Sequence, residues 1–347
     1  MARVGVLTRE GDSACPAVAT SGGGGTRRTE ETPPKGLARG CWRSSERPPS
    51  KRIVLTSTGA RVAPMGEERE GREVAGTVRE IAVRARGETV PVTLFEPARP
   101  TSDILFLHGY ARHPLDYRAL LERFVQEGHR VVAPFVFANG SLRRTPTTFW
   151  ACAALARRVV ETLVHEGELA PGAAAFGHST GGAVTLTLGG SALEPSALVA
   201  VNPVQPSRAS SPLFIARSAW MNTKMALGLA GDGSAARRVL ADSGPRFYGN
   251  WLRSAARNYR LIGGLKAYDH VKLARWTSRR RPFLGPATVL YGHGDEFYPS
   301  CQGLEAGLSA VFEDFELEEL PRENSHEWLM FRLDLAHERI GRALRRG

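Results

Sequence analysis

Apolar and polar positions alternate in two neighbouring segments close to residue 80. Residues 78–84 and 89–95 both show this alternation, and Gly87 lies between them. A period of two is typical of half-buried strands, and glycine is favoured where a tight turn joins such strands. The pattern predicts a β-hairpin.

From residue 104 onward, short apolar runs are separated by segments whose apolar residues recur at helical spacing. Continuous apolar runs are typical of strands buried on both faces. Repeated strand–helix units predict an α/β fold, with a mostly parallel central sheet flanked by helices. We expect strands at 104–107, 130–135, 173–176, 198–201, 286–291 and 314–320, and helices at 116–127, 147–166, 180–192, 299–312 and 328–345.

The segment from about 205 to 284 interrupts this rhythm. It is mostly helical in pattern, contains no strong strand, and carries Trp220, Trp251 and Tyr259. An insertion of this kind between two core strands predicts a helical cap. Its aromatic side chains either form the cap's own core, as large apolar residues usually do, or contribute to a substrate pocket.

Residues 1–75 differ in composition from the rest of the chain. They hold the glycine run 22–25, two Pro-Pro pairs and scattered Ser, Thr and Arg, with poor apolar periodicity. Because such a segment buries little apolar surface, we expect a disordered, basic, low-complexity tail before a domain at 76–347. We also hypothesise that translation starts at Met65, which an intact mass that includes residues 1–64 would refute.

The net charge of +11 raises the question of a nucleic-acid partner. Residues 1–64 hold 11 Lys and Arg against 5 Asp and Glu, a net charge of +6, and residues 65–347 hold 35 against 30, a net charge of +5. Over half of the excess therefore lies in residues 1–64, and the run Arg279–Arg281 is typical of a solvated loop. We expect no specific nucleic-acid partner.

The 4 cysteines form neither a disulfide framework nor a zinc-binding spacing. No apolar run is long enough to cross a membrane, and the N-terminus lacks the apolar stretch of a secretory signal. These features favour a cytoplasmic protein. The sequence leaves the oligomeric state open.

The strongest motif is GHSTGG at residues 177–182, which matches the pattern G-x-S-x-G between a predicted strand and a predicted helix. The pattern places Ser179 on a sharp strand-to-helix turn as a nucleophile, and the small residues around it prevent clashes with neighbouring backbone. The helix N-terminus then directs N–H groups and a positive dipole end toward a developing oxyanion. A plain glycine-rich turn is the alternative interpretation.

The sequence His108-Gly109-Tyr110 directly follows the strand predicted at 104–107. In a parallel sheet this turn lies beside the one that carries Ser179. We expect the backbone N–H groups of Tyr110 and Thr180 to form the oxyanion hole. The side chain of His108 fits a structural role, hydrogen-bonded to its own loop.

The acid and the base of a catalytic triad are expected after two later strands. Asp295 follows the strand at 286–291, where a carboxylate is needed to orient a histidine, and Glu296 is its nearest rival. His326 follows the strand at 314–320 and is the predicted general base. The chain has 9 histidines, and His326 is singled out by the order Ser, Asp, His along the chain.

With these motifs the chain from about 78 to 345 resembles the α/β-hydrolase superfamily. The resemblance rests on HGY at 108–110, GHSTGG at 177–182, GHGDEFYP at 292–299 and NSHEWL at 324–329, together with the stretch at 115–135. Within the superfamily it is most similar to the monoacylglycerol lipase and serine aminopeptidase group. Residues 134–140 depart from that group, because they lack the acidic residue and the Arg-Gly-His-Gly turn usual in such lipases.

The resemblance implies a serine hydrolase that cleaves a carboxylic ester through an acyl-enzyme, without a metal or an organic cofactor. A small acyl ester or a lipid is the expected substrate. Serine at 179 argues against epoxide hydrolases, which the resemblance would give an aspartate there. An acyltransferase, a thioesterase or a peptidase could use the same triad, since fold does not determine substrate. A non-catalytic binding protein on this scaffold is the alternative from another class.

Overall fold

The computed structural model describes residues 76–110, 112–136, 148–204, 216, 220, 283–293, 295, 304–320 and 326–347. The chain divides into two compact units, Met1–Lys51 and Arg52–Gly347. The described residues all belong to the second unit. The expected tail at 1–75 and nearly all of the expected cap at 205–284 lie outside them.

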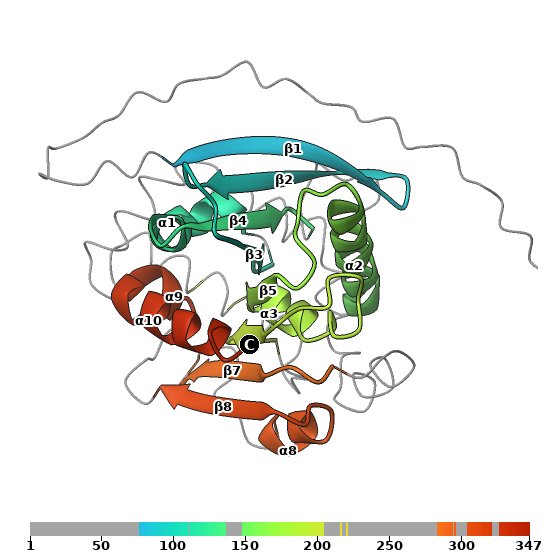
Figure 1. Cartoon of the computed structure of the whole chain (residues 1–347). Coiled ribbons are helices and arrows are strands. Elements are labelled where there is room, and N and C mark those ends of the chain that lie inside the picture. Colours follow the sequence, from blue (N-terminus) through green and yellow to red (C-terminus); the bar gives the residue numbers. More distant parts are fainter. Residues whose placement is uncertain are drawn as a thin grey trace, which may run out of the picture. The chain divides into compact units, whose positions relative to one another are not determined.

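An eight-stranded sheet forms the centre of the second unit, in the order β1-β2-β4-β3-β5-β6-β7-β8. β1 pairs antiparallel with β2, and β2 pairs antiparallel with β4. All other neighbours are parallel, so the expected mostly parallel sheet is confirmed (Figure 1). The strands are β1 Thr77–Ala85, β2 Glu88–Glu96, β3 Ser102–Leu107, β4 His129–Pro134, β5 Ala174–His178, β6 Leu198–Val201, β7 Ala287–Gly292 and β8 Phe315–Leu320.

Helices cover both faces of the sheet, with α1 and α10 on one face and α2 and α3 on the other (Figure 1). Each long helix turns an apolar stripe toward the strands, as Leu120, Leu121 and Phe124 do in α1. The helices are α1 Arg118–Gln126, α2 Phe149–His165, α3 Thr180–Thr185, α8 Leu304–Ser309, α9 Trp328–Phe331 and α10 Leu333–Leu344, with the 3-10 helix η1 at Pro114–Tyr117. None of the helices described here is long and apolar enough to cross a membrane.

The hairpin expected around Gly87 is confirmed as β1 and β2. Its two turn residues, Arg86 and Gly87, have φ angles of 54° and 78°. Two successive positive φ values are those of a type I′ turn, whose twist matches that of the flanking strands.

Two helix predictions were wrong in extent. The helix expected at 180–192 ends at Thr185, and the N–H groups of Thr187 and Leu188 then bond to carbonyls three residues back, as in a tight turn. The helix expected at 328–345 is two helices. Arg332 separates them with φ of −108° and ψ of 60°, outside the helical region.

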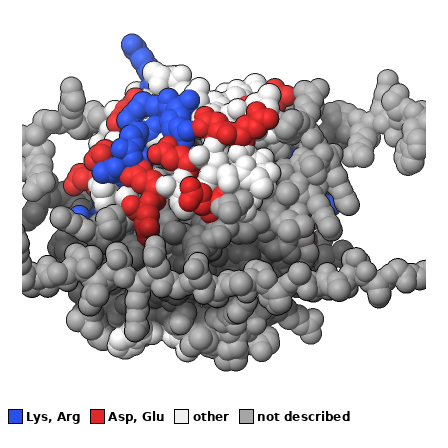
Figure 2. All heavy atoms as spheres, turned by 90° about the horizontal axis from the view of Figure 1, so that it is seen from below, with Lys and Arg blue, Asp and Glu red and all other residues white. Residues whose placement is uncertain are grey.

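Ion pairs attach the edge strand β8 to α10 and to the residues that follow this helix. Glu318 binds Arg339 at 2.7 Å and Arg342 at 2.5 Å, and Glu316 binds Arg346 at 2.7 Å. Figure 2 shows basic and acidic side chains of the described residues side by side on this view of the molecule. Among the described residues on this face the charges are interspersed, so these residues do not form a patch of one sign.

The turn after β5 is packed against β3 without space for side chains at two glycines. A Cβ on Gly177 would lie 2.5 Å from both the carbonyl oxygen of Gly181 and Oγ1 of Thr185. A Cβ on Gly181 would overlap the carbonyl oxygens of Leu107 and His108. The carbonyl oxygens among these atoms belong to the backbone of α3 and of the end of β3, so they cannot move aside cheaply.

Gly181→Ala should therefore destabilise the protein by about 3 kcal/mol or more, measured by urea unfolding. Gly167→Ala is the matched control, since Gly167 has a φ of +74° and open space around its Cβ position. That control should cost about 1–2 kcal/mol, the strain of a left-handed residue alone. Equal losses in the two variants would contradict the packing argument.

Candidate active site

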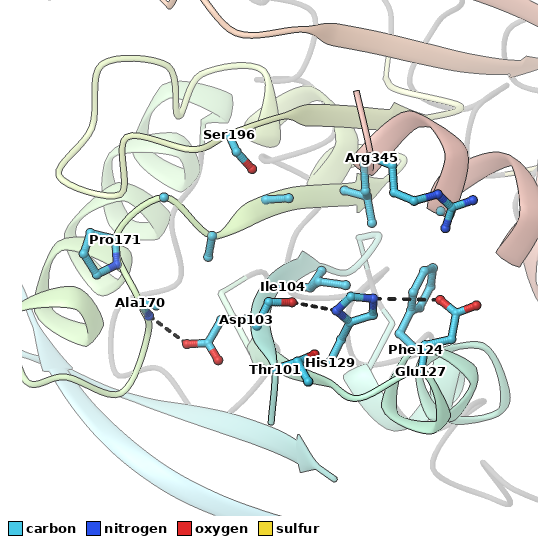
Figure 3. A pocket seen from close by; sticks show the side chains of 16 residues that line it. Thr101, Asp103, Ile104, Phe124, Glu127, His129, Ala170, Pro171, Ser196 and Arg345 are labelled. Atoms are coloured by element: carbon cyan, nitrogen blue, oxygen red, sulfur yellow. Dashed lines mark hydrogen bonds and ion pairs between the residues drawn. The ribbon is translucent and has the colours of Figure 1, made fainter. Parts of the chain in front are cut away.

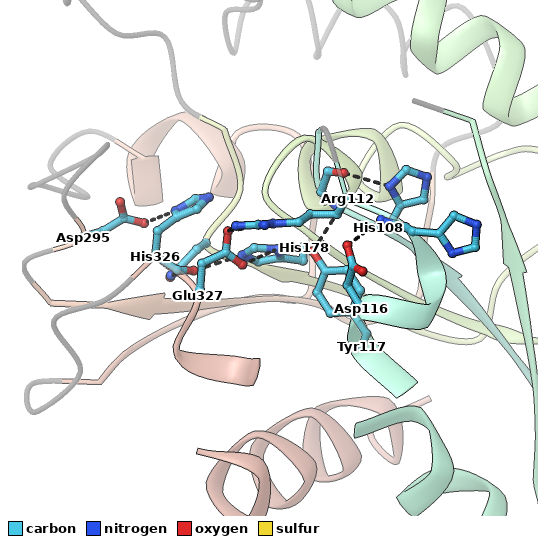
Figure 4. A network of polar contacts seen from close by, with 11 residues as sticks. His108, Arg112, Asp116, Tyr117, His178, Asp295, His326 and Glu327 are labelled. Carbon is cyan, nitrogen blue, oxygen red and sulfur yellow. Dashed lines mark hydrogen bonds and ion pairs between the residues drawn. The ribbon is translucent and has the colours of Figure 1, made fainter. Parts of the chain in front are cut away.

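The expected site residues follow three strands at one edge of the sheet. Ser179 follows β5, Asp295 lies just beyond β7, and His326 lies after β8. These strands are parallel, so their carboxyl ends share the edge at which open sheets of this kind bind ligands. Figure 4 shows Asp295 and His326 in contact, beside His178 at the end of β5.

Ser179 occupies a strained turn. Its backbone has φ of 54° and ψ of −119°, a region that residues other than glycine rarely adopt. Such a conformation costs about 1–3 kcal/mol and persists where surrounding contacts enforce it. Here the N–H of Ser179 donates to Val201 at 2.9 Å, and its carbonyl accepts from Val204 at 3.1 Å. The half-buried side chain thus lies at the N-terminus of α3.

The structure brings His326 and Asp295 together. Nδ1 of His326 lies 2.6 Å from Oδ2 of Asp295, and both residues are buried. A carboxylate at this nitrogen fixes the ring tautomer, with the proton on Nδ1 and Nε2 as the basic nitrogen. The rival carboxylate Glu296 lies outside the described residues.

Two side chains hold the main chain of His326. Nδ2 of Asn202 donates to the His326 carbonyl at 2.9 Å, and Nε2 of His178 lies 2.9 Å from the same oxygen. Oδ1 of Asn202 also accepts from the N–H of Gly292 at 2.8 Å. The ends of β5, β6 and β7 therefore fix the loop that carries His326.

The loop at 108–110 runs beside Ser179. A Cβ on Gly109 would lie 3.4 Å from Cβ of Ser179 and 3.1 Å from Nδ1 of His178, so only glycine fits without displacement. Thr180 is fully buried as the first residue of α3. The backbone amides of Tyr110 and Thr180 thus belong to the two segments that flank Ser179, as an oxyanion hole requires.

A chain of hydrogen bonds connects this loop to His326. The N–H of Gly109 donates to the Tyr117 hydroxyl at 3.2 Å, and that hydroxyl lies 2.7 Å from Nδ1 of His178. Because the His326 carbonyl can only accept, Nε2 of His178 carries the proton and Nδ1 accepts from the Tyr117 hydroxyl. His178 is therefore neutral in this arrangement.

Burial keeps two histidines of the site neutral. It lowers the pKa of His178 from 6.5 to about 4 and the pKa of His108 from 6.5 to about 3. Nδ1 of His108 lies 2.8 Å from the Gly109 carbonyl, to which it donates. His108 is thus bonded to its own loop, consistent with the structural role expected for it.

A buried ion pair joins the same two loops. Nη2 and Nε of Arg112 lie 2.6 Å and 3.2 Å from Oε1 of Glu327, and the two side chains are 6% and 5% exposed. Burial by itself would raise the pKa of Glu327, but the facing guanidinium of Arg112 and the nearby imidazoles of His178 and His326 together outweigh it, and the pKa falls from 4.5 to about 2. Both groups are charged at neutral pH.

Arg112, Tyr117, Asn202 and Glu327 contact the site, although the sequence did not single them out. Glu327 directly follows the predicted base in the sequence, and this adjacency was the available signal. Arg112 and Asn202 lie in no motif, and Tyr117 lies in the stretch at 115–135 without a role assigned to it, because the partners of these residues are distant in the chain and are brought close only by the fold.

A separate cavity lies at the opposite edge of the sheet, at the amino ends of β3, β4 and β5 (Figure 3). Its volume is about 370 Å³. Nδ1 of His129 lies 2.6 Å from Oγ of Ser102, and its Nε2 lies 3.8 Å from Glu127. The cavity contains none of the expected site residues.

Other chemistries find little support in the described part of the chain. Within it, no group of three or more His, Cys, Asp or Glu side chains could hold a metal ion. Cys152 is buried, and burial raises the pKa of its thiol to about 12, so it is a poor nucleophile near neutral pH.

Comparison with known proteins agrees with this architecture. A family model described as the alpha/beta hydrolase family matches residues 104–335. The naproxen esterase (carboxylesterase NP) of Bacillus subtilis is 17% identical, with a TM-score of 0.53 over 77% of this chain and 92% of that chain. No curated protein gives a significant match.

Two other solved structures have a similar fold. The 2-hydroxy-6-oxo-6-phenylhexa-2,4-dienoate hydrolase of Rhodococcus sp. strain RHA1 is 17% identical, with a TM-score of 0.54 over 78% of this chain and 100% of that chain. A mutant epoxide hydrolase of Vigna radiata is 13% identical, with a TM-score of 0.52 over 78% of this chain and 99% of that chain. Such low identities indicate a common fold only.

The two neutral histidines make the protein sensitive to acid. Their pKa values in the folded state lie below the ordinary 6.5, so the stability they contribute is complete above that pH. It is lost as the pH falls toward about 4 for His178 and about 3 for His108. The unfolding free energy should fall by about 1.4 kcal/mol per pH unit for each histidine across this window.

Imidazole NMR of the folded protein provides the direct test. The rings of His108 and His178 should keep neutral-form resonances down to about pH 5, whereas the same residues in urea titrate near the ordinary value. Titration of either folded ring between about pH 6 and 7 would refute the assignment.

Proposed function

This chain belongs to the alpha/beta hydrolase family, and on that premise we propose that it is a serine hydrolase that cleaves carboxylic esters through a covalent acyl-enzyme. The observation that carries the proposal is the strained turn at Ser179, which lies at the same sheet edge as the hydrogen-bonded pair His326 and Asp295. A small acyl ester or a lipid ester is the proposed substrate.

In the proposed mechanism, Oγ of Ser179 attacks the ester carbonyl carbon while Nε2 of His326 takes its proton. Asp295, at 2.6 Å from Nδ1, stabilises the imidazolium that forms. His326 then gives its proton to the leaving alkoxide, and an alcohol departs. Water attacks the acyl-enzyme by the same route, which releases the acid and restores Ser179.

The developing oxyanion is bound by backbone N–H groups in this proposal. Thr180 supplies one from the N-terminus of α3, and Tyr110 supplies the other from the loop after β3. Fixed donors in a buried site stabilise the tetrahedral intermediate without reorganisation at the moment of reaction. The contact of Gly109 with Ser179 supports this assignment, because it brings the loop within reach.

A serine that is activated to attack esters should also react with a fluorophosphonate probe. We expect labelling of the wild-type protein and none of Ser179→Ala, together with hydrolysis of p-nitrophenyl esters in a panel from acetate to palmitate. The best substrate in the panel measures the length of the acyl site. Circular dichroism of Ser179→Ala serves as the folding control. Absence of labelling in well-folded wild-type protein would refute the proposal.

The products distinguish hydrolysis from acyl transfer. Added alcohols or thiols should compete poorly with water for the acyl-enzyme of a hydrolase. Formation of the transfer product as the main product would show that the same residues act in an acyltransferase.

The three proposed catalytic side chains should act as a unit. Ser179→Ala should lower kcat roughly 10³-fold to 10⁶-fold, and adding His326→Ala should change it little further. Steady-state kinetics of the single and double variants test this. Multiplicative losses in the double variant would mean that His326 does not activate Ser179.

A further inference from the structure

The ion pair between Arg112 and Glu327 lies where charge is expensive. Its residues are 215 positions apart in the sequence, and burial leaves their side chains 6% and 5% exposed. Desolvation of two ions costs several kcal/mol each, so a buried pair is often no more stabilising than two apolar side chains. A contribution to stability is therefore a weak explanation for a charged pair at this position. The loops to which Arg112 and Glu327 belong suggest a different role.

Arg112 ends the loop that carries the proposed oxyanion hole. Its own N–H donates to the Gly109 carbonyl at 3.1 Å, and Nδ1 of His108 binds the same oxygen at 2.8 Å. The peptide bond between Gly109 and Tyr110 is planar and trans, so its N–H points opposite to its C=O. Two bonds that fix the Gly109 carbonyl therefore also fix the direction of the Tyr110 N–H.

Glu327 is the residue after His326. The His326 carbonyl, part of the peptide that joins the two residues, accepts from Asn202 and His178, both at 2.9 Å. On the other side of the same residue, Nδ1 of His326 meets Asp295. A carboxylate held at position 327 thus restrains the main chain from which the imidazole projects.

The pair connects these two loops side chain to side chain. Figure 4 shows Arg112 extending from its loop toward Glu327, next to His178 and His326. The chain from Gly109 through Tyr117 and His178 to His326 makes a second, neutral connection between the same loops. The charged connection can be removed while every residue of the neutral connection stays in place, although Oε2 of Glu327 also lies 3.8 Å from Nδ1 of His178.

We propose that Arg112 and Glu327 are positioning residues, whose ion pair fixes the loop bearing the Tyr110 N–H relative to the loop bearing His326. The inference rests on the proposed function, since it concerns the alignment of the oxyanion donor with the base. Misplacement of catalytic groups by as little as about 1 Å can cost on the order of 100-fold in rate. The pair therefore acts on kcat rather than on substrate affinity.

Glu327→Gln is the primary variant, with Asp103→Asn as its matched control. Asp103 accepts from Nη2 and Nε of Arg130 at 2.6 Å and 2.8 Å, and it is a buried partner of arginine at the opposite edge of the sheet. Both variants remove a buried carboxylate that pairs with an arginine, although Arg130 is partly exposed. Thermal unfolding is measured beside kcat and KM on the best ester of the panel.

We expect Glu327→Gln to lower kcat about 10-fold to 100-fold with KM changed less than about twofold. Asp103→Asn should lower the unfolding temperature but leave kcat within about twofold of wild type. Arg112→Lys, which keeps the charge, should recover part of the kcat that Arg112→Met loses. Unchanged kcat in Glu327→Gln, or an equal fall of kcat in Asp103→Asn, would overturn the proposal.

A double variant keeps the test decisive if the single variants unfold. Arg112→Met combined with Glu327→Leu replaces the pair by apolar groups, which is often neutral or stabilising for folding. We expect a folded protein whose kcat is still lowered about 10-fold or more. Wild-type kcat in that variant would overturn the proposal.

Fluorophosphonate labelling distinguishes failure of the positioning role from failure of the proposed serine hydrolase activity. A wild-type protein that labels at Ser179, with pair variants of unchanged kcat, overturns the positioning role and leaves the serine hydrolase intact. A wild-type protein that neither labels nor hydrolyses esters overturns both.

Discussion

Backbone contact between the turn after β5 and the end of β3 is the constraint on which the site depends. Neither Gly177 nor Gly181 has room for a Cβ, because a Cβ on Gly177 would meet the Gly181 carbonyl in α3, and one on Gly181 would meet the Leu107 and His108 carbonyls at the end of β3. This contact brings α3 against β3 and leaves Ser179 with a φ of 54°. The loop after β3 is forced alongside Ser179 for the same reason. Strain at one residue and proximity of two loops thus have a single cause.

Much of this arrangement follows from local sequence. The apolar runs predicted the parallel strands, because a strand covered on both faces needs apolar residues at successive positions. The glycines around Ser179 and the order of Ser179, Asp295 and His326 predicted which loops meet at the carboxyl edge. The contact between His326 and Asp295 agrees with that expectation, while their catalytic roles remain a proposal.

The remaining features depend on distant parts of the chain. Arg112 and Glu327 are 215 positions apart, and each looks in the sequence like an ordinary charged loop residue. The helical pattern at 328–345 does not show that Arg332 leaves the helical region, since apolar spacing continues on both sides of it. Helix propensity and apolar periodicity depend on residues that are close in the sequence. The pairing of Arg112 with Glu327 and the conformation of Arg332 are determined by tertiary contacts instead.

The salt bridges of β8 also bear on aggregation of the protein through this edge strand. An exposed edge strand offers unpaired N–H and C=O groups to any other strand, and charged side chains on such an edge are a recognised protection. Glu318 of β8 is paired with two arginines of α10 and Glu316 with Arg346 just after that helix, so an incoming strand would lie beside paired charges. The ion pairs that secure the last helix thereby oppose extension of the sheet into an intermolecular aggregate.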